Sequence, residues 1–474
     1  MMAKRRAHSD GGTHPNRVSI VTLDNHLVGT LGRAAAALAK EGFDLDVRVH
    51  VAGDWDDPNE RERLAADVAS SRLVVVGQIF LQEHVDVVKP LLEAAPDDQT
   101  CGVLLSNGEL TPFMRMGSFS PGDPSQQGRF SPARLLAKLR GKSKGGADSA
   151  KKQLRSLRRA RKILRFVPGS AQDVRAYLLS LEAWLSGSTS NITDMLRLLA
   201  ARYLPEAAPA SASKTIPDLE TYPDAGLYHP DLPGYGIVEE VRALPRPKKA
   251  AGTVGLLVGR SYVLAGNTAH YDAVIRALEA RGIAVRAAFA AGLDAREPIE
   301  RFFTADGRLP QIDYMISLTG FSLVGGPAWH DGPAAQKVLA ELDVPFVVAQ
   351  PLEFQTLDGW KTDPRGLLPL EAALMVAIPE LDGATNPIVF GGRADTANSG
   401  TPDAVPIPER VERLAERAVR SIRLRRKRNA ERRVAVVLFN FPPAAGNAGS
   451  AAYLDVFDSL HRLLRLRFRH FSGD

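Results

Sequence analysis

The stretch that decides the fold is residues 17–51, RVSIVTLDNHLVGTLGRAAAALAKEGFDLDVRVHV. It opens with an apolar run rich in β-branched residues, which is typical of a buried strand. Leucine and alanine then recur at helical spacing up to Lys40, Gly42 ends this helix, and a second apolar run follows at 45–51. A strand, a helix and another strand in this order form the unit of a parallel sheet whose strands are joined by crossover helices.

The same alternation of apolar runs and amphipathic stretches continues along the chain. The sequence therefore predicts the α/β class, with several doubly wound parallel-sheet domains and an inserted helical segment. The predicted strands are 17–23, 45–51, 72–77, 101–106, 253–258, 283–288, 312–318, 344–348 and 433–439. The predicted helices are 27–40, 59–69, 81–95, 150–165, 171–186, 191–204, 268–280, 295–303, 334–342, 408–430 and a last one with its apolar face at 453–464.

Shifts in composition divide the chain into expected domains. We expect a disordered N-terminus at 1–16, an N-terminal α/β domain at 17–130, a basic helical segment at 131–204, a Pro-rich connection at 205–250, a second α/β domain at 251–407, and the start of a third α/β unit at 408–474. Extended, poorly packed backbone is expected in the Pro-rich connection. The third unit has a strand and a helix but no following strand, so we expect the chain to be truncated inside a domain.

Length and composition exclude several classes of protein. With 474 residues, of which 45% are hydrophobic, the chain has room for more than one core and is not disordered. Its apolar runs are shorter than the ~20 residues of a membrane-spanning helix, so no integral membrane segment is predicted. The single cysteine, Cys101, cannot form an intramolecular disulfide and fits the reducing cytoplasm.

The positive charge of the chain is local. Residues 134–165 contain thirteen Lys or Arg and one acidic residue, a net charge of +12, and the whole chain carries +6, so the remainder is acidic. These segments also lack the interleaved aromatic residues of a base-stacking surface, which argues against a nucleic-acid partner. The segment 134–165 is either a solvated helix face or a docking surface for an acidic partner subunit.

Seven stretches of the sequence carry a resemblance to one family. They are VTLDNHL at 21–27, the segment 109–117, RSYVLAGNTAHYDAVIRALEARG at 260–282, SLTGFSLVGGPA at 317–328, PLEFQTLDGW at 351–360, LLPLEAALMVAIPELDGATNPIVFGGR at 367–393 and VVLFNFPPAAGNAGSAAYLDVFDSLH at 436–461. In this order they resemble the large, porphyrin-binding H subunit of magnesium chelatase, which is related to the large subunit of cobaltochelatase. The resemblance covers residues 17–461.

The resemblance implies a function in (bacterio)chlorophyll biosynthesis. The family inserts Mg²⁺, the substrate ion, into protoporphyrin IX, and the ATP is hydrolysed by an AAA+ partner subunit that acts with a third subunit. The family's large subunit is longer and assigns metal insertion to a C-terminal body, so this chain is expected to be the N-terminal part and inactive alone. A cobaltochelatase-type subunit acting on a corrin precursor, or a non-catalytic fragment that binds a tetrapyrrole or docks a partner, remain the alternatives.

Two asparagines in Gly-Asn loops, Asn267 and Asn447, are candidate substrate-binding residues. Each is expected between a strand and a helix, where free backbone N–H groups could hold the porphyrin's propionates or a phosphate. The alternative is a glycine turn with asparagine as the helix N-cap. No GxxxxGK[ST] motif occurs, so the sequence offers no ATP site of its own.

His270, Tyr271 and Glu353 complete the candidate substrate-binding residues. An imidazole could accept a pyrrole proton or bind Mg²⁺ transiently, although Mg²⁺ prefers oxygen ligands and a histidine at a helix start more often caps or packs. Glu353, like Glu371 and Glu380, could accept pyrrole protons, or could equally order a loop. The sequence assigns no catalytic and no metal-ligating residue.

Overall fold

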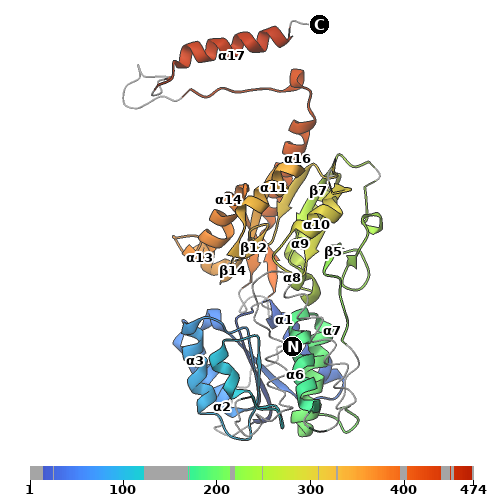
Figure 1. The fold of residues 1–474 in the computed structure, drawn as a ribbon, viewed down its shortest axis with the longest axis vertical. Coiled ribbons are helices and arrows are strands. Elements are labelled where there is room, and N and C mark those ends of the chain that lie inside the picture. The colour runs from blue at the N-terminus through green and yellow to red at the C-terminus, as the bar shows by residue number, and fades with distance from the viewer. Residues whose placement is uncertain are drawn as a thin grey trace, which may run out of the picture. The chain divides into compact units, whose positions relative to one another are not determined.

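The protein is described from a computed structural model. It describes residues 14–24, 26–121, 169, 171–213, 219–247, 249–307, 309–326, 329–394, 403–438, 449 and 453–471. These residues form two compact units, 1–416 and 417–474 (Figure 1). The predicted helix at 150–165, the basic segment 134–165 and the N-terminus before residue 14 lie outside the described residues.

The N-terminal part of the first unit is built on a four-stranded parallel sheet. Its strands lie in the order β2-β1-β3-β4, and every neighbouring pair is parallel. The alternation read from residues 17–51 is confirmed, because β1 and β2 pair in parallel with α1 between them. The elements are β1 (His14–Thr22), α1 (Leu27–Lys40), β2 (Asp46–Val51), α2 (Pro58–Ser70), β3 (Ser71–Gly77), α3 (Gln82–Glu93) and β4 (Thr100–Leu104).

Helices cover both faces of this sheet. In Figure 1, α2 and α3 lie on one side of the strands, and α1 lies on the other with α6 (Ala171–Ser186) and α7 (Thr189–Tyr203). Asp57 accepts a hydrogen bond from the backbone N–H of Asn59 and caps α2, which begins at Pro58, the position where a missing N–H costs nothing. Valines of β1 and β3 and leucines of α1 are fully buried between these layers.

The second sheet of the first unit has eight strands in the order β16-β15-β14-β11-β7-β8-β5-β6. The five strands from β15 to β8 pair in parallel, whereas β16, β5 and β6 add antiparallel edges. The strands are β5 (Ala225–Tyr228), β6 (Ile237–Val238), β7 (Gly252–Leu257), β8 (Ile283–Ala290), β11 (Tyr314–Ser317), β14 (Phe346–Thr356), β15 (Thr385–Arg393) and β16 (Ala404–Pro406).

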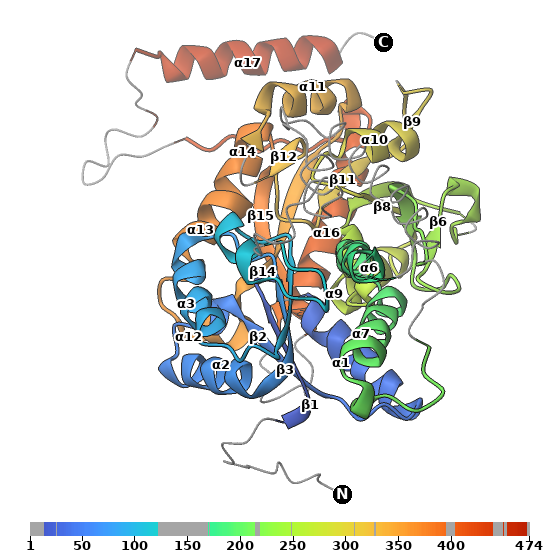
Figure 2. The ribbon, with the colours of Figure 1, turned by 60° about the horizontal axis from the view of Figure 1, so that its bottom comes forward.

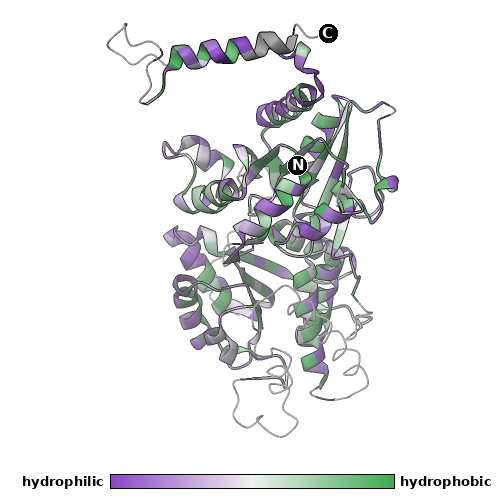
Figure 3. Ribbon diagram, turned by 45° about the horizontal axis from the view of Figure 1, so that its top comes forward, coloured by the Kyte–Doolittle hydropathy of each residue, from purple (hydrophilic) through white to green (hydrophobic). Residues whose placement is uncertain are grey.

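The parallel strands of this sheet are connected by short helices (Figure 2). These are α8 (Arg260–Ala265), α9 (Ala269–Glu279), α10 (Arg296–Pro298), α11 (Gly332–Leu342), α12 (Leu357–Thr362), α13 (Pro369–Ala372) and α14 (Ile378–Asp382). The longer helix α16 (Pro408–Arg426) follows the last strand, β16. Two short ribbons, β9 (Thr304–Ala305) with β10 (Leu309–Pro310) and β12 (Gly325–Gly326) with β13 (Trp329–His330), lie outside the large sheets. Figure 3 shows both hydrophobic and hydrophilic residues along most helices, as expected where one side covers a sheet.

Strand order places the two sheets in one topological class. Among the parallel strands of each sheet, the chain forms a central strand first, adds the next strand on one side, and then crosses to the other side. The fold class predicted from the sequence, doubly wound parallel sheets, is therefore confirmed. The crossing point lies between β1 and β3 in the first sheet and between β7 and β11 in the second.

The Pro-rich segment differs from expectation. The prediction of poorly packed backbone is wrong for 225–228, because β5 is fully buried and pairs antiparallel with β8. Prolines flank this strand and do not interrupt it, so its N–H groups stay free to pair.

The second unit also corrects a sequence-based prediction. Residues 433–438 of the predicted strand 433–439 have no strand pairing in the part of the chain that the structure describes, because an apolar run becomes a strand only where a neighbour accepts its hydrogen bonds. The predicted final helix is α17 (Val456–Phe471), which begins after Tyr453. Phe457, Leu463 and Leu464 on this helix are exposed.

Candidate functional site

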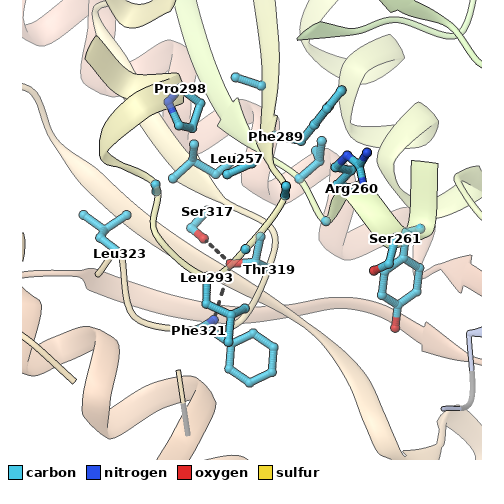
Figure 4. A pocket seen from close by; sticks show the side chains of 18 of the residues that line it. Leu257, Arg260, Ser261, Phe289, Leu293, Pro298, Ser317, Thr319, Phe321 and Leu323 are labelled. Carbon is cyan, nitrogen blue, oxygen red and sulfur yellow. Dashed lines mark hydrogen bonds between the residues drawn. The ribbon is translucent and has the colours of Figure 1, made fainter. Parts of the chain in front are cut away.

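A cavity of about 280 Å³ opens at the carboxyl ends of β7, β8, β11 and β14 (Figure 4). This is the crossing point of the second sheet, the position at which doubly wound sheets bind their ligands. The loops after β7 and β11 run to opposite faces of the sheet and leave room between them. The lining consists of Leu185, 257–262, Tyr271, 288–293, Ala295, Pro298, Ser317, Thr319, 321–323 and Glu353.

One wall of the cavity is apolar and carries hydroxyl groups at its base. Leu293 and Phe321 lie side by side in Figure 4. The Ser317 and Thr319 hydroxyls are 2.9 Å apart and hydrogen-bonded, and the Thr319 oxygen is 3.5 Å from the Phe321 nitrogen. An apolar surface with a few oriented polar groups suits a flat, mostly apolar ligand with a polar edge.

The opposite wall is the first turn of α8. Arg260 begins this helix, and its guanidinium donates to the backbone carbonyls of Pro223 (2.9 Å) and Tyr222 (3.2 Å). These contacts hold a positive charge at the cavity wall. The guanidinium is the group in this lining best suited to a ligand's carboxylate, because it can donate several hydrogen bonds in one plane.

A carboxyl group and a phenol meet at the cavity edge. The Tyr262 hydroxyl donates to Glu353 Oε1 at 2.9 Å. Burial, and to a smaller extent the neighbouring charges of Asp24 and Glu371, raise the pKa of Glu353 to about 7, although the hydrogen bond from Tyr262 opposes the rise. Glu353 can therefore gain or lose a proton close to neutral pH, as a general base must.

His270 lies behind this wall in a cluster of rings. It is fully buried, its ring centroid is 3.9 Å from that of Tyr271 and 5.7 Å from that of Phe390, and neither ring nitrogen has a hydrogen-bond partner among the described residues. Burial lowers its pKa to about 3, so the ring is neutral at physiological pH. His270 is not among the residues that line the cavity.

The structure brings together part of the predicted site. Glu353 and Tyr271 line the cavity, where the Tyr271 oxygen accepts a hydrogen bond from the Gly259 N–H at 3.2 Å. Asn267 is buried, and its Oδ1 accepts from the backbone N–H of Ala404 at 2.8 Å, so it links α8 to β16. The Gly-Asn loop at 266–267 directly follows the short helix α8, which lies between it and strand β7. Asn447 lies outside the described residues.

Two residues of the loop after β1 lie beside the cavity residues Tyr262 and Glu353, which sequence reasoning missed. Asp24 and His26 lie between β1 and α1, and the His26 ring centroid lies 5.5 Å from that of Tyr262. Burial raises the pKa of Asp24. The position of both residues in the sequence could have indicated a role near a site, because they come soon after a buried central strand.

A second buried carboxylate holds the apolar wall. Asp382 is 1% exposed and accepts hydrogen bonds from the Ser322 hydroxyl (2.7 Å) and the Leu323 N–H (2.9 Å), and its other oxygen is 2.7 Å from His330 Nε2. Ser322 and Leu323 line the cavity, so Asp382 fixes the loop that forms this wall.

Two classes of feature are absent from the described residues. Within the described ranges, no three His, Cys, Asp or Glu side chains gather closely enough to hold a metal ion. Nor does that part of the chain contain a helix both long and apolar enough to cross a membrane.

Comparison with known proteins decides the family. The family model described as CobN/Magnesium Chelatase matches residues 181–467, and one described as Domain of unknown function (DUF3479) matches residues 17–178. The chain belongs to the CobN/magnesium chelatase family. The resemblance noted in the sequence is thereby confirmed, and the cavity lies in the part of the chain that matches the chelatase family.

Individual relatives agree with this assignment. The chain is 44% identical to the H subunit of magnesium chelatase from Rhodobacter capsulatus, over 96% of its own length and 38% of that protein. It is 38% identical to the chloroplastic ChlH subunit of magnesium chelatase from Oryza sativa, over 86% of this chain and 30% of the relative. The solved catalytic subunit of cobaltochelatase from Mycobacterium tuberculosis shares the fold, with a TM-score of 0.52 and 19% identity over 96% of this chain and 31% of that one. The chain thus spans about 38% of the Rhodobacter relative.

Proposed function

We propose that this chain is the N-terminal part of the porphyrin-binding large subunit of a magnesium chelatase of (bacterio)chlorophyll biosynthesis, and that its cavity holds one edge of protoporphyrin IX. The identity of 44% over 96% of the chain to the large subunit of a bacterial magnesium chelatase is the observation that carries the assignment. In this proposal Mg²⁺ is the substrate ion, and ATP is hydrolysed in the cytoplasm by an AAA+ partner subunit together with a third subunit.

The size and lining of the cavity support binding of an edge of the macrocycle. Sites for whole drug-sized ligands measure roughly 300–1,000 Å³, and this cavity measures about 280 Å³. Phe321 and Leu293 offer apolar contacts to a pyrrole, and Arg260 offers a positive charge to a propionate. Asn267, His270 and Asn447 remain predictions as substrate contacts.

Insertion of Mg²⁺ into the porphyrin releases two protons from pyrrole nitrogens. Glu353 is the group in the cavity suited to accept one of them, because its carboxyl titrates near pH 7 and its orientation is fixed by Tyr262. The ionised Glu353 carboxylate would accept the pyrrole proton, and it would become ionised again when it releases this proton to solvent.

Fluorescence quenching of protoporphyrin IX by the purified chain tests the proposal. We expect weak, saturable quenching whose affinity changes with pH around 7. Glu353→Gln should abolish this pH dependence, whereas the matched variant Glu380→Gln, at an exposed position, should retain it. Absence of saturable quenching by the wild-type chain would refute the assignment of the cavity.

The alternative is a subunit of the cobaltochelatase type, and the shared fold is the observation that supports it. A corrin precursor offered in competition with protoporphyrin IX distinguishes this alternative from a magnesium chelatase. Preference for the corrin would favour that alternative. We further propose that the 474-residue chain inserts no Mg²⁺ by itself, since the Rhodobacter relative is more than twice as long. Detectable metallation by the chain alone would contradict this.

A further inference from the structure

Helix α8 carries the polar wall of the cavity. Three of its residues, Arg260, Ser261 and Tyr262, line the cavity, and Tyr262 holds Glu353. The helix has only six residues and ends at Ala265, followed by Gly266 with a positive φ of 70°. So short a helix has little stability of its own, and its direction depends on what its ends contact.

The carbonyl oxygen of Ala265, at the end of α8, is bound by the N-terminal part of the chain. Arg33 Nη2 donates to it at 2.6 Å, the Thr30 hydroxyl at 3.2 Å and the Thr189 hydroxyl at 3.4 Å. Thr30 and Arg33 lie one turn apart on α1, and Thr189 begins α7. A positive guanidinium at a helix carboxyl end is also favoured by the helix dipole.

Arg33 joins α8 to a second element. Its Nη1 donates to Asp403 Oδ2 at 2.7 Å, immediately before β16. Asp403 approaches α1 so closely that a Cβ atom at Gly29 would lie 2.0 Å from its Oδ1. A glycine inside a helix lowers the free energy of unfolding by about 1 kcal/mol relative to alanine. At position 29 the missing side chain leaves room for Asp403.

Tyr262, in the middle of α8, also meets the loop after β1. His26 packs its ring on Tyr262, and the charge of Asp24 acts on Glu353. The loop after β1 therefore contacts α8 at Tyr262, and α1 contacts its carboxyl end at Ala265.

We propose that the N-terminal part of the chain, which matches a domain of unknown function, is a positioning module for the cavity, and that Arg33 is its principal positioning residue. Arg33 fixes α8 so that Tyr262 stays in reach of Glu353. The role in ligand binding rests on the proposed function of the cavity, whereas the fixing of α8 does not.

Four variants test this inference. Arg33→Met keeps the aliphatic stem and removes the contacts with Ala265 and Asp403, whereas Arg33→Lys keeps the charge. Thr30→Val removes one donor to Ala265. The matched control is Arg276→Met on the neighbouring helix α9, which removes an exposed ion pair with Asp231. Amide hydrogen exchange of the peptide 260–267 reports on α8 without any ligand. Protoporphyrin IX quenching reports on the cavity.

We expect Arg33→Met to speed exchange of 260–267 about tenfold and to weaken porphyrin binding about tenfold, which corresponds to one hydrogen bond to a charged group. Arg33→Lys should recover part of both effects, and Arg276→Met should change neither. If Arg33→Met does not fold, Arg33→Lys and Thr30→Val decide the question. Exchange of 260–267 at the wild-type rate in the folded variants would overturn the inference. If the wild-type chain binds no porphyrin but exchange still responds, the positioning of α8 stands and the proposed function fails.

Discussion

Glu353 should make the protein less stable as the pH rises through neutrality. Its carboxyl is partly buried beside Tyr262, and its pKa is raised from an ordinary value of 4.5 to about 7, mainly by burial. The folded protein therefore binds more protons than the unfolded chain between these two pH values. The stabilising effect is complete below pH 4.5 and is lost as the pH rises through 7.

The magnitude follows from the two pKa values. The difference between 4.5 and about 7, at about 1.4 kcal/mol per pH unit, corresponds to about 3 kcal/mol of unfolding free energy. Glutamine has the same shape, can still accept the Tyr262 hydrogen bond through its amide oxygen, and cannot ionise. We expect Glu353→Gln to match the wild type at pH 4.5 and to exceed it by about 3 kcal/mol at pH 8.5.

Urea unfolding followed by tryptophan fluorescence at pH 4.5, 6, 7 and 8.5 measures this difference. The exposed Glu380→Gln variant is the matched control, and its unfolding free energy should run parallel to that of the wild type. If the Glu353→Gln and wild-type curves are also parallel, Glu353 does not titrate near neutrality and is not a proton acceptor at this pH.

Three further substitutions test how the cavity is built. Gly29→Ala places a Cβ 2.0 Å from Asp403 Oδ1 and should lower the unfolding free energy by about 1–3 kcal/mol. Asp382→Ala removes the acceptor shared by the Ser322 hydroxyl and the Leu323 N–H, so it should cost about 3 kcal/mol in urea unfolding and speed amide exchange at 319–326. Burial lowers the pKa of His270 from 6.5 to about 3, so at pH 5 only the unfolded chain binds a proton there, which favours unfolding. His270→Phe removes this effect, and its unfolding free energy at pH 5, taken relative to pH 8, should exceed that of the wild type by about 2 kcal/mol in urea unfolding.

Each of these has a matched comparison. A Cβ atom at Gly32, on the same helix, would have no other atom within 4 Å, and Gly32→Ala should raise the unfolding free energy by about 0.5–1 kcal/mol. Asp382→Asn retains one acceptor oxygen, which can serve both loop donors, and should cost less than alanine. Equal losses would show that these hydrogen bonds do not stabilise the wall. Loss of porphyrin binding in a folded His270→Phe variant would instead support a direct role for His270.

Much of the fold follows from local patterns. The helix at 27–40 and the strand at 283–288 were predicted within two residues of the observed bounds, because their apolar spacing and the glycines that flank them act over a few residues. Strand β14 was predicted only to residue 348 but extends to Thr356, since Pro351 and the polar residues after it are typical of a loop. Pairing with β15 keeps them in the sheet, and pairing is a long-range property.

For the candidate site, too, some features follow from the sequence and others only from the tertiary structure. The sequence by itself determined the α/β class and the family resemblance, because those depend on residue type and order, and it named Glu353 and Tyr271 as candidates, which line the cavity. Only the tertiary structure decided that His270 is buried behind the wall, that α1 binds the end of α8 through Arg33, and that Glu353 titrates near pH 7. Burial and electrostatic environment depend on residues far apart in the chain that the sheet order brings together, and no local pattern contains that order.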